Sequence, residues 1–285
     1  MKALIVGGKG QLGRALVATA PSTAEIVSHD LDTLDITDCA AIAAAVAEIA
    51  PDIVFNAAAY TAVDKAESEE AQALAVNATA VGYLADAACA AGARLVHVST
   101  DFVFDGLAGV PYRFDDAPNP LSAYGRTKLA GEKAAGADAL IVRTAWVYAP
   151  TGGNFVRTML RVMAERPEVR VVADQIGTPT YAPGLASALW TMAGKDGRGL
   201  HHYTDAGVCS WYDFAVAIQE EALLAGLLDK AVPVVPIGTS DYPTPARRPH
   251  FSVLDKTSTF SILGGPTPHW RVNLRTMIGW IKNHG

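Results

Sequence analysis

A tyrosine and a lysine four positions apart, Tyr124 and Lys128, form the pattern with the clearest chemical use. Side chains at positions i and i+4 of a helix share one face. An ammonium group beside a phenol favours phenolate and lowers the tyrosine pKa from about 10 towards neutral pH, so the phenol can pass a proton to a carbonyl oxygen. A hydroxyl from Thr100, which ends a strand-like run, could bond the same oxygen. Taken alone, this spacing also fits an exposed helix face.

Three glycines near the N-terminus are spaced for binding a diphosphate. Gly7, Gly10 and Gly13 form a GxxGxxG pattern between the apolar run at 3–6 and a helix expected at 11–20. Glycine permits the tight turn, lets backbone amides approach phosphate at the positive end of the helix, and allows close packing of helix on strand. A purely structural turn is the alternative, but the position after the first strand favours a dinucleotide site.

Carboxylates after the second expected strand complete this dinucleotide pattern. Asp30 is placed to hold the adenosine ribose hydroxyls, with Asp32 as a competing candidate. No arginine stands nearby to neutralise a 2′-phosphate, so the local sequence favours NADH or dual use over strict NADPH. Asp35 and Ile36 suit the adenine, although Asp35 and Asp38 could instead cap a helix.

Short β-branched runs alternate with alanine-rich helical stretches in the first half of the chain, a pattern typical of a parallel sheet with helical crossovers. We expect strands at 3–6, 25–27, 52–56, 94–99 and 139–143, and helices at 11–20, 38–50, 67–91 and 122–135. Prolines and glycines become frequent after Tyr148. Further helices are expected at 154–165, 183–193, 211–225 and 274–282, with strands at 169–172 and 200–204.

The predicted fold is therefore an α/β, Rossmann-type doubly wound parallel sheet with a smaller C-terminal α/β substrate lobe. Residues 1–150 would form the NAD(P)-binding domain and 151–285 mainly the substrate-binding lobe, and segments near 169–204 could return to the first domain. No segment repeats with a period of 20 to 50 residues.

Composition excludes several classes of protein. The chain has 285 residues, 50% hydrophobic and 18% charged, which excludes disorder. Its net charge of −6 gives no general attraction to nucleic acid or membrane surfaces. No uninterrupted apolar run approaches a membrane span and no leader is visible, so we expect a cytoplasmic protein. The three cysteines support neither disulfides nor a zinc site, and no metal is expected.

Five separated blocks resemble one family. The glycine turn, the strand-end Ser99-Thr100 and the Tyr124/Lys128 pair resemble the extended short-chain dehydrogenase/reductase superfamily. More narrowly, the chain is similar to the dTDP-4-dehydrorhamnose reductase family in the blocks 56–67, 99–106, 124–132, 143–148 and 245–249.

This resemblance implies a reaction and a set of site residues. The reaction is hydride transfer from NADPH or NADH to C4 of dTDP-4-dehydro-6-deoxy-L-mannose, with Tyr124 as proton donor, giving dTDP-L-rhamnose, a precursor of cell-surface polysaccharide. Thr100, Asp101 and Trp146 would hold the sugar. The implied assembly is a monomer or a homodimer. The cofactor would be lined by Gln11, Leu12, Asp30, Asp35, Ile36, Ala59, Tyr60, Thr61, Val98, Tyr124 and Lys128.

The C-terminal segment supplies a candidate diphosphate contact. Residues 244–285 carry six lysines or arginines against Asp255 alone. Arg247 and Arg248 follow a proline-rich turn, and a guanidinium fork matches a diphosphate; a purely structural ion pair is the alternative. Phe102 departs from the family, which commonly has a tyrosine there.

Two other functions fit the same motifs. One is a catalytically silent regulatory subunit on this fold, which the intact Thr100, Tyr124 and Lys128 argue against. The other is a nucleotide-sugar epimerase or dehydratase. Dehydratases usually carry an acidic pair after the strand-end threonine, whereas here Asp101 is followed by Phe102.

Overall fold

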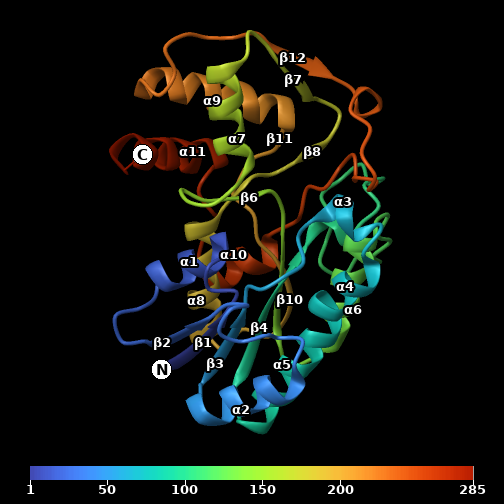
Figure 1. Ribbon diagram of the computed structural model, residues 1–285, viewed down its shortest axis with the longest axis vertical. Coiled ribbons are helices and arrows are strands. Elements are labelled where there is room, and N and C mark those ends of the chain that lie inside the picture. Colours follow the sequence, from blue (N-terminus) through green and yellow to red (C-terminus); the bar gives the residue numbers. More distant parts are fainter. Residues whose placement is uncertain (285) are drawn as a thin grey trace.

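A six-stranded parallel sheet forms the centre of the larger lobe in the computed structural model, which describes residues 1–284 (Figure 1). The strand order is β10-β5-β4-β3-β1-β2. The strands are β1 (Lys2–Val6), β2 (Glu25–His29), β3 (Ile53–Asn56), β4 (Arg94–Thr100), β5 (Leu140–Thr144) and β10 (Gly199–His202). Each neighbouring pair runs parallel, which confirms the predicted fold class. The chain changes direction of winding between β1 and β3, and ligands of such sheets bind at this point.

Helices cover both faces of the sheet, which explains why its central strands read as continuous apolar runs. Every residue of β3 and β5 is buried. Packed on one face are α1 (Gln11–Ala18) and α8 (Ala182–Gly194); on the other are α2 (Cys39–Ile49), α5 (Ala80–Ala90) and α6 (Ala123–Ala135). Asp38 caps α2 by accepting from Ala40 N and Ala41 N, as predicted.

The helix predicted at 67–91 runs without a break from residue 70 to residue 90 and contains a π-helical turn. It consists of α4 (Glu70–Leu74), the π-helical turn η1 (Ala75–Thr79) and α5, and the short helix α3 (Val63–Ala66) precedes it. Periodicity alone cannot predict a π-turn, because it inserts one residue without changing composition. By length and composition the stretch Glu70–Ala90 could cross a membrane, but here it packs against α6 and β4.

The smaller lobe lies at the opposite end of the molecule from the N-terminus (Figure 1). Its core contains residues from three helices, including Phe214, Leu274 and Met277, all fully buried. The helices are α7 (Phe155–Glu165), α9 (Trp211–Ala225) and α11 (Trp270–His284). Beside them lie two short pairs: β7 (Val169–Val172) with β12 (Val234–Ile237), and β8 (Ile176–Gly177) with β11 (Cys209–Ser210). The turn η3 (Thr239–Asp241) follows β12.

The chain crosses between the lobes more than once. Beyond residue 150, β9 (Thr180–Tyr181) pairs with β6 (Val147–Tyr148), and α8 and β10 then pack within the larger lobe. The helix α10 (Thr257–Leu263) contacts α8 and β10. Part of the second half of the sequence therefore contributes to the larger lobe, and the boundary near residue 150 stays a prediction.

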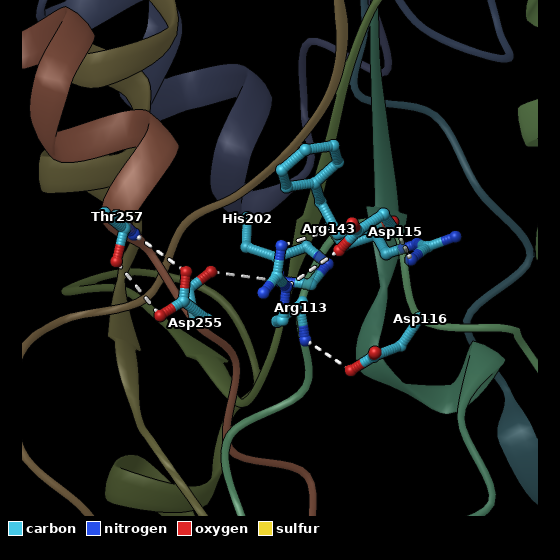
Figure 2. Close-up of polar contacts among 8 residues, drawn as sticks. Arg113, Asp115, Asp116, Arg143, His202, Asp255 and Thr257 are labelled. Atoms are coloured by element: carbon cyan, nitrogen blue, oxygen red, sulfur yellow. Dashed lines mark hydrogen bonds and ion pairs between the residues drawn. The ribbon is translucent and has the colours of Figure 1, made fainter.

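Polar contacts tie the late chain to the outer edge of the sheet (Figure 2). His202 of β10 lies with Nδ1 3.1 Å from the Asp255 carbonyl oxygen, and Thr257 N donates to Asp255 Oδ1 at 3.1 Å. Arg143 of β5 donates to the Phe114 carbonyl oxygen at 3.4 Å. The bonds of His202 and Arg143 hold the loops at Asp255 and Phe114 against β10 and β5, although each loop is far from its strand in sequence.

Candidate active site

A large cavity of about 1050 Å³ runs along the carboxyl edge of the sheet. It begins at the turn after β1, passes the end of β3 and reaches the ends of β4 and β5, so it spans the point where the winding reverses. Most residues predicted for the cofactor line it: Gly7, Gly10, Gln11, Leu12, Asp30, Asp35, Ile36, Ala59, Tyr60, Thr61, Val98, Tyr124 and Lys128.

The glycine turn has the geometry of a phosphate cradle. Gly7 has φ +79°, and a Cβ there would lie 2.5 Å from Ala58 N of the neighbouring loop. A Cβ on Gly13 would lie 2.1 Å from Gly7 O, so Gly13 acts through close packing and does not line the cavity. The N-cap of α1, Gly10, makes no side-chain cap. The first amides of α1 are thus available for a diphosphate, and the site fits a dinucleotide.

The corner expected to hold the adenosine ribose contains a lysine that the sequence analysis missed. Lys9 N donates to Asp30 Oδ2 at 2.7 Å, and the Lys9 ammonium pairs with Asp32. Arg14 Nε donates to Lys9 O at 2.8 Å. No arginine lies on the strand end itself, yet this corner holds cations from the glycine turn and α1. Lys9 lies within the glycine pattern, so the sequence already contained a cation close to the expected ribose site.

The loop after β3 is held in place by side chains of the next helices. Asn77, in the π-turn η1, accepts from Tyr60 N at 2.8 Å and donates to Tyr60 O at 3.1 Å. The Tyr60 hydroxyl donates to Glu69 at 2.5 Å. The extra residue of the π-turn therefore places an amide where it fixes the cavity wall formed by Ala59, Tyr60 and Thr61.

Thr100, Asp101 and Tyr124 meet at the far end of the cavity. Thr100 ends β4 and its hydroxyl donates to Asp101 Oδ1 at 3.0 Å, at the start of the short helix η2 (Asp101–Val103). Ser122 caps α6 by accepting from Gly125 N, so Tyr124 lies in the first turn of this helix. The Phe102 ring packs edge-on against Tyr124, with centroids 5.5 Å apart.

Burial dominates the ionisation of these groups. It raises the pKa of Tyr124 to about 12, with the nearby Asp101 charge acting in the same direction and the Thr100 hydroxyl opposing it. Burial also raises the pKa of Asp101 to about 6, and Asp101 Oδ2 is buried without a partner. Lys128 Nζ donates to Val98 O at 2.7 Å. The expected lowering of the Tyr124 pKa by Lys128 is therefore not seen, and the phenol is held protonated.

Trp146 lies in the cavity wall in an uncommon conformation. It has φ +48°, and its indole stacks on Trp211 at the start of α9 with centroids 3.7 Å apart and planes 13° from parallel. A positive φ costs free energy for a residue with a side chain, so the surrounding packing must hold it. The stacked pair joins the cavity to the smaller lobe.

Arg247 and Arg248 lie outside the residues that line the cavity. Arg248 forms an ion pair with Asp64 of α3, with Nη2 and Oδ2 2.9 Å apart, and also bonds Thr244. The hydrogen bond from Arg248, helped by its charge, lowers the pKa of Asp64. Arg247 is exposed. Arg248 is therefore bound to a neighbouring carboxylate, whereas the side chain of Arg247 is exposed to solvent.

Metal ligands do not gather in the described part of the chain. Within residues 1–284, no three His, Cys, Asp or Glu side chains are grouped to hold a metal ion. The cysteines Cys39, Cys89 and Cys209 are free thiols.

Almost the whole chain matches one family and its relatives. The family model described as "RmlD substrate binding domain" matches residues 1–282. A dTDP-4-dehydrorhamnose reductase from Burkholderia thailandensis is 45% identical, covering 95% of this chain and 96% of the relative. The chain belongs to the dTDP-4-dehydrorhamnose reductase family. Membership was predicted from five blocks, and the match extends over the full fold.

Two solved members of the dTDP-4-dehydrorhamnose reductase family have nearly the same structure. The Clostridium acetobutylicum enzyme superposes with a TM-score of 0.92 at 41% identity, covering 99% of this chain and 100% of that one. The Bacillus anthracis enzyme, solved in complex with NADP, has a TM-score of 0.91 at 35% identity, with 98% and 99% covered.

Proposed function

We propose that the protein reduces the C4 keto group of dTDP-4-dehydro-6-deoxy-L-mannose with NADPH or NADH, giving dTDP-L-rhamnose. The observation that carries this proposal is the continuity of the cavity, which joins the glycine turn to Thr100 and Tyr124. A dinucleotide bound along the carboxyl edge of the sheet would reach from the phosphate cradle to the phenol. The nucleotide-sugar relatives named above support the substrate class.

The side chains at the far end would supply the proton and hold the sugar. Bound nicotinamide supplies the hydride. Tyr124, neutral because its pKa is raised to about 12, donates its proton to the C4 oxygen. The Thr100 hydroxyl, which donates to Asp101 in the substrate-free site, turns to donate its one proton to that oxygen. Lys128 resupplies the proton to Tyr124 from the same helix face. Asp101 and Trp146, both in the cavity wall, would bind the sugar ring.

The decisive experiment is consumption of NADH and NADPH, assayed in parallel with the 4-keto sugar nucleotide. Product that comigrates with dTDP-L-rhamnose supports the proposal. A nucleotide-sugar epimerase or dehydratase would convert a sugar nucleotide without net consumption of reduced cofactor. A regulatory subunit would bind the cofactor and leave both substrates unchanged. Either result would exclude the reductase.

Cofactor preference should depend on the corner formed by Lys9, Asp30 and Asp32. Asp30→Ala should raise the ratio of kcat/KM with NADPH to that with NADH by about five- to tenfold, because a charge that repels a 2′-phosphate is lost from a screened site. Lys9→Met should lower the same ratio by a similar factor, since its ammonium pairs with Asp32 at that corner. Steady-state kinetics with both cofactors measure the ratio. If Asp30→Ala leaves it unchanged, Asp32 or backbone groups set the preference instead.

Arg247 and Arg248 should differ in their effects on substrate affinity. If Arg247 contacts the sugar-nucleotide diphosphate, Arg247→Ala should raise KM for the sugar nucleotide about tenfold or more and leave the cofactor Kd unchanged. Arg247→Lys should restore only part of the affinity, because an ammonium lacks the fork geometry. Arg248→Ala should mainly lower thermal stability through loss of the Asp64 pair. Native affinity in both alanine variants would place the diphosphate elsewhere.

A further inference from the structure

A buried histidine next to Lys128 has no part in the chemistry described so far. His97 lies in the middle of β4 and is fully buried. Its Nε2 is 3.4 Å from Lys128 Nζ, and its Nδ1 is 3.1 Å from Asn56 Nδ2 on the neighbouring strand β3. The three side chains form a chain of polar contacts that ends at the cavity wall, where Lys128 is found.

The orientation of the Asn56 amide decides which histidine nitrogen carries the proton. Asn56 Oδ1 accepts a hydrogen bond from Ala58 N at 3.1 Å, so the NH₂ group of Asn56 must face His97. An amide NH₂ can only donate, and His97 Nδ1 must therefore be the acceptor. Burial and the Lys128 charge hold the pKa of His97 well below its usual range, so the ring is neutral. Its single proton lies on Nε2, directed at Lys128.

An N–H aimed at an ammonium group opposes the positive charge. Lys128 Nζ already donates to Val98 O, and a neutral amine could accept from His97 Nε2 with its lone pair, whereas an ammonium could not. We propose that His97, held as its Nε2–H tautomer by Asn56, is a positioning residue that favours the neutral amine of Lys128 and so keeps that lysine able to exchange protons near neutral pH. This inference rests on the proposed function only in its kinetic consequence.

The other groups around Lys128 do not replace this effect. Burial lowers the pKa of Lys128 to about 8, and Glu132, one turn further along α6, acts in the opposite direction. The Glu132 carboxylate is itself taken up by Arg143 and by the Ser99 hydroxyl at 2.6 Å. Tyr124 lies one turn earlier on α6, and the charge that acts on it comes from Asp101 in η2.

Two helices packed on α6, α3 and α4, direct their charged groups elsewhere. Glu70 of α4 pairs with the exposed Arg126, and Asp64 of α3 pairs with Arg248. The π-turn η1 contributes only the amide of Asn77, which donates to Thr127. His97 is thus the group whose proton faces Lys128 from the sheet.

The tautomer can be tested directly in the unmodified full-length protein. Nitrogen-15 NMR of histidine-labelled protein should show His97 with a protonated Nε2 and an unprotonated Nδ1 across neutral pH. The resonance is assigned by its loss in His97→Leu, or by long-range couplings if that variant does not fold. A protonated Nδ1 would overturn the proposal, whatever the variants below show.

The effect on Lys128 is tested by reversing the tautomer. Asn56→Asp supplies a carboxylate that accepts from His97 Nδ1, so Nε2 becomes an acceptor for the Lys128 ammonium. The titration midpoint of the Lys128 ¹³Cε resonance should then rise by about one pH unit. In the Asn56→Asp/His97→Leu double variant the rise should be less than about half as large, because only the through-space charge remains. Equal rises in both backgrounds would overturn the inference.

Kinetics add a readout that separates this inference from the proposed reaction. In the plot of kcat against pH, the fall of kcat at alkaline pH should shift to higher pH in Asn56→Asp. The shift should equal that of the Lys128 titration midpoint. If the Lys128 titration midpoint rises but the alkaline fall of kcat stays at the same pH, the proposed role of Lys128 in proton exchange is overturned. The NMR results use the resting protein, so they stand or fail independently of whether the 4-keto sugar nucleotide is the substrate.

Discussion

Tyr124→Phe is expected to lower kcat for reduction of the sugar nucleotide by about 10²- to 10⁴-fold, the usual contribution of a general acid. The substitution removes the phenolic proton and keeps the ring that packs edge-on against Phe102, so the cavity should keep its shape. The cofactor Kd should change little, because the phosphate cradle lies at the other end of the cavity. Single-turnover rates and fluorescence titration with NADPH measure the two quantities.

Tyr60→Phe is the matched control for this prediction. Tyr60 lines the same cavity, and its hydroxyl is bonded to Glu69 rather than directed at the ends of β4 and β5. Its loss should change kcat by less than about threefold, the size of a single neutral contact away from the reacting atoms. If Tyr124→Phe kept near-native turnover, the proton donor would have to be another group, and Asp101 would be the next candidate because its pKa is raised to about 6.

Arg143→Met is expected to lower the free energy of unfolding by about 3–5 kcal/mol. Arg143 on β5 donates two hydrogen bonds to Glu132, at 2.7 and 2.8 Å, and both side chains are almost fully buried, with 3% and 7% exposed. Methionine has a similar length but leaves the Glu132 carboxylate unpaired in the interior. Urea unfolding followed by circular dichroism measures the loss.

Two further variants show whether burial causes this loss. Arg143→Met/Glu132→Gln should recover a large part of the stability, because no charge is left unpaired. Arg161→Met breaks the pair with Glu165, in which both side chains are more than half exposed, and should cost less than about 0.5 kcal/mol. If Arg143→Met lowers the free energy of unfolding by less than about 1 kcal/mol, water reaches the Glu132 carboxylate. The ion pair then contributes little to holding α6 against β5.

Many elements could be predicted because their signals are local. The strand predicted at 169–172 and the helix predicted at 211–225 have the observed bounds, β7 and α9. Short elements such as β6, β9 and α10 were missed, since two to seven residues carry too little periodicity. The helix expected at 67–91 is confirmed over residues 70–90, but its π-turn was missed, because periodicity does not reveal a single inserted residue.

The amino-acid sequence by itself determined the parts of the site that lie within one strand, turn or helix. The glycine spacing specifies the cradle after β1, and the four-residue spacing places Tyr124 and Lys128 on one face of α6. Only the tertiary structure decided which distant groups act on them. The sheet order places a lysine beside Asp30 and Asn56 in contact with His97, and loop packing brings Arg248 to Asp64. Composition and periodicity carry no information on such pairs, because they depend on which strands become neighbours and on how the intervening loops pack.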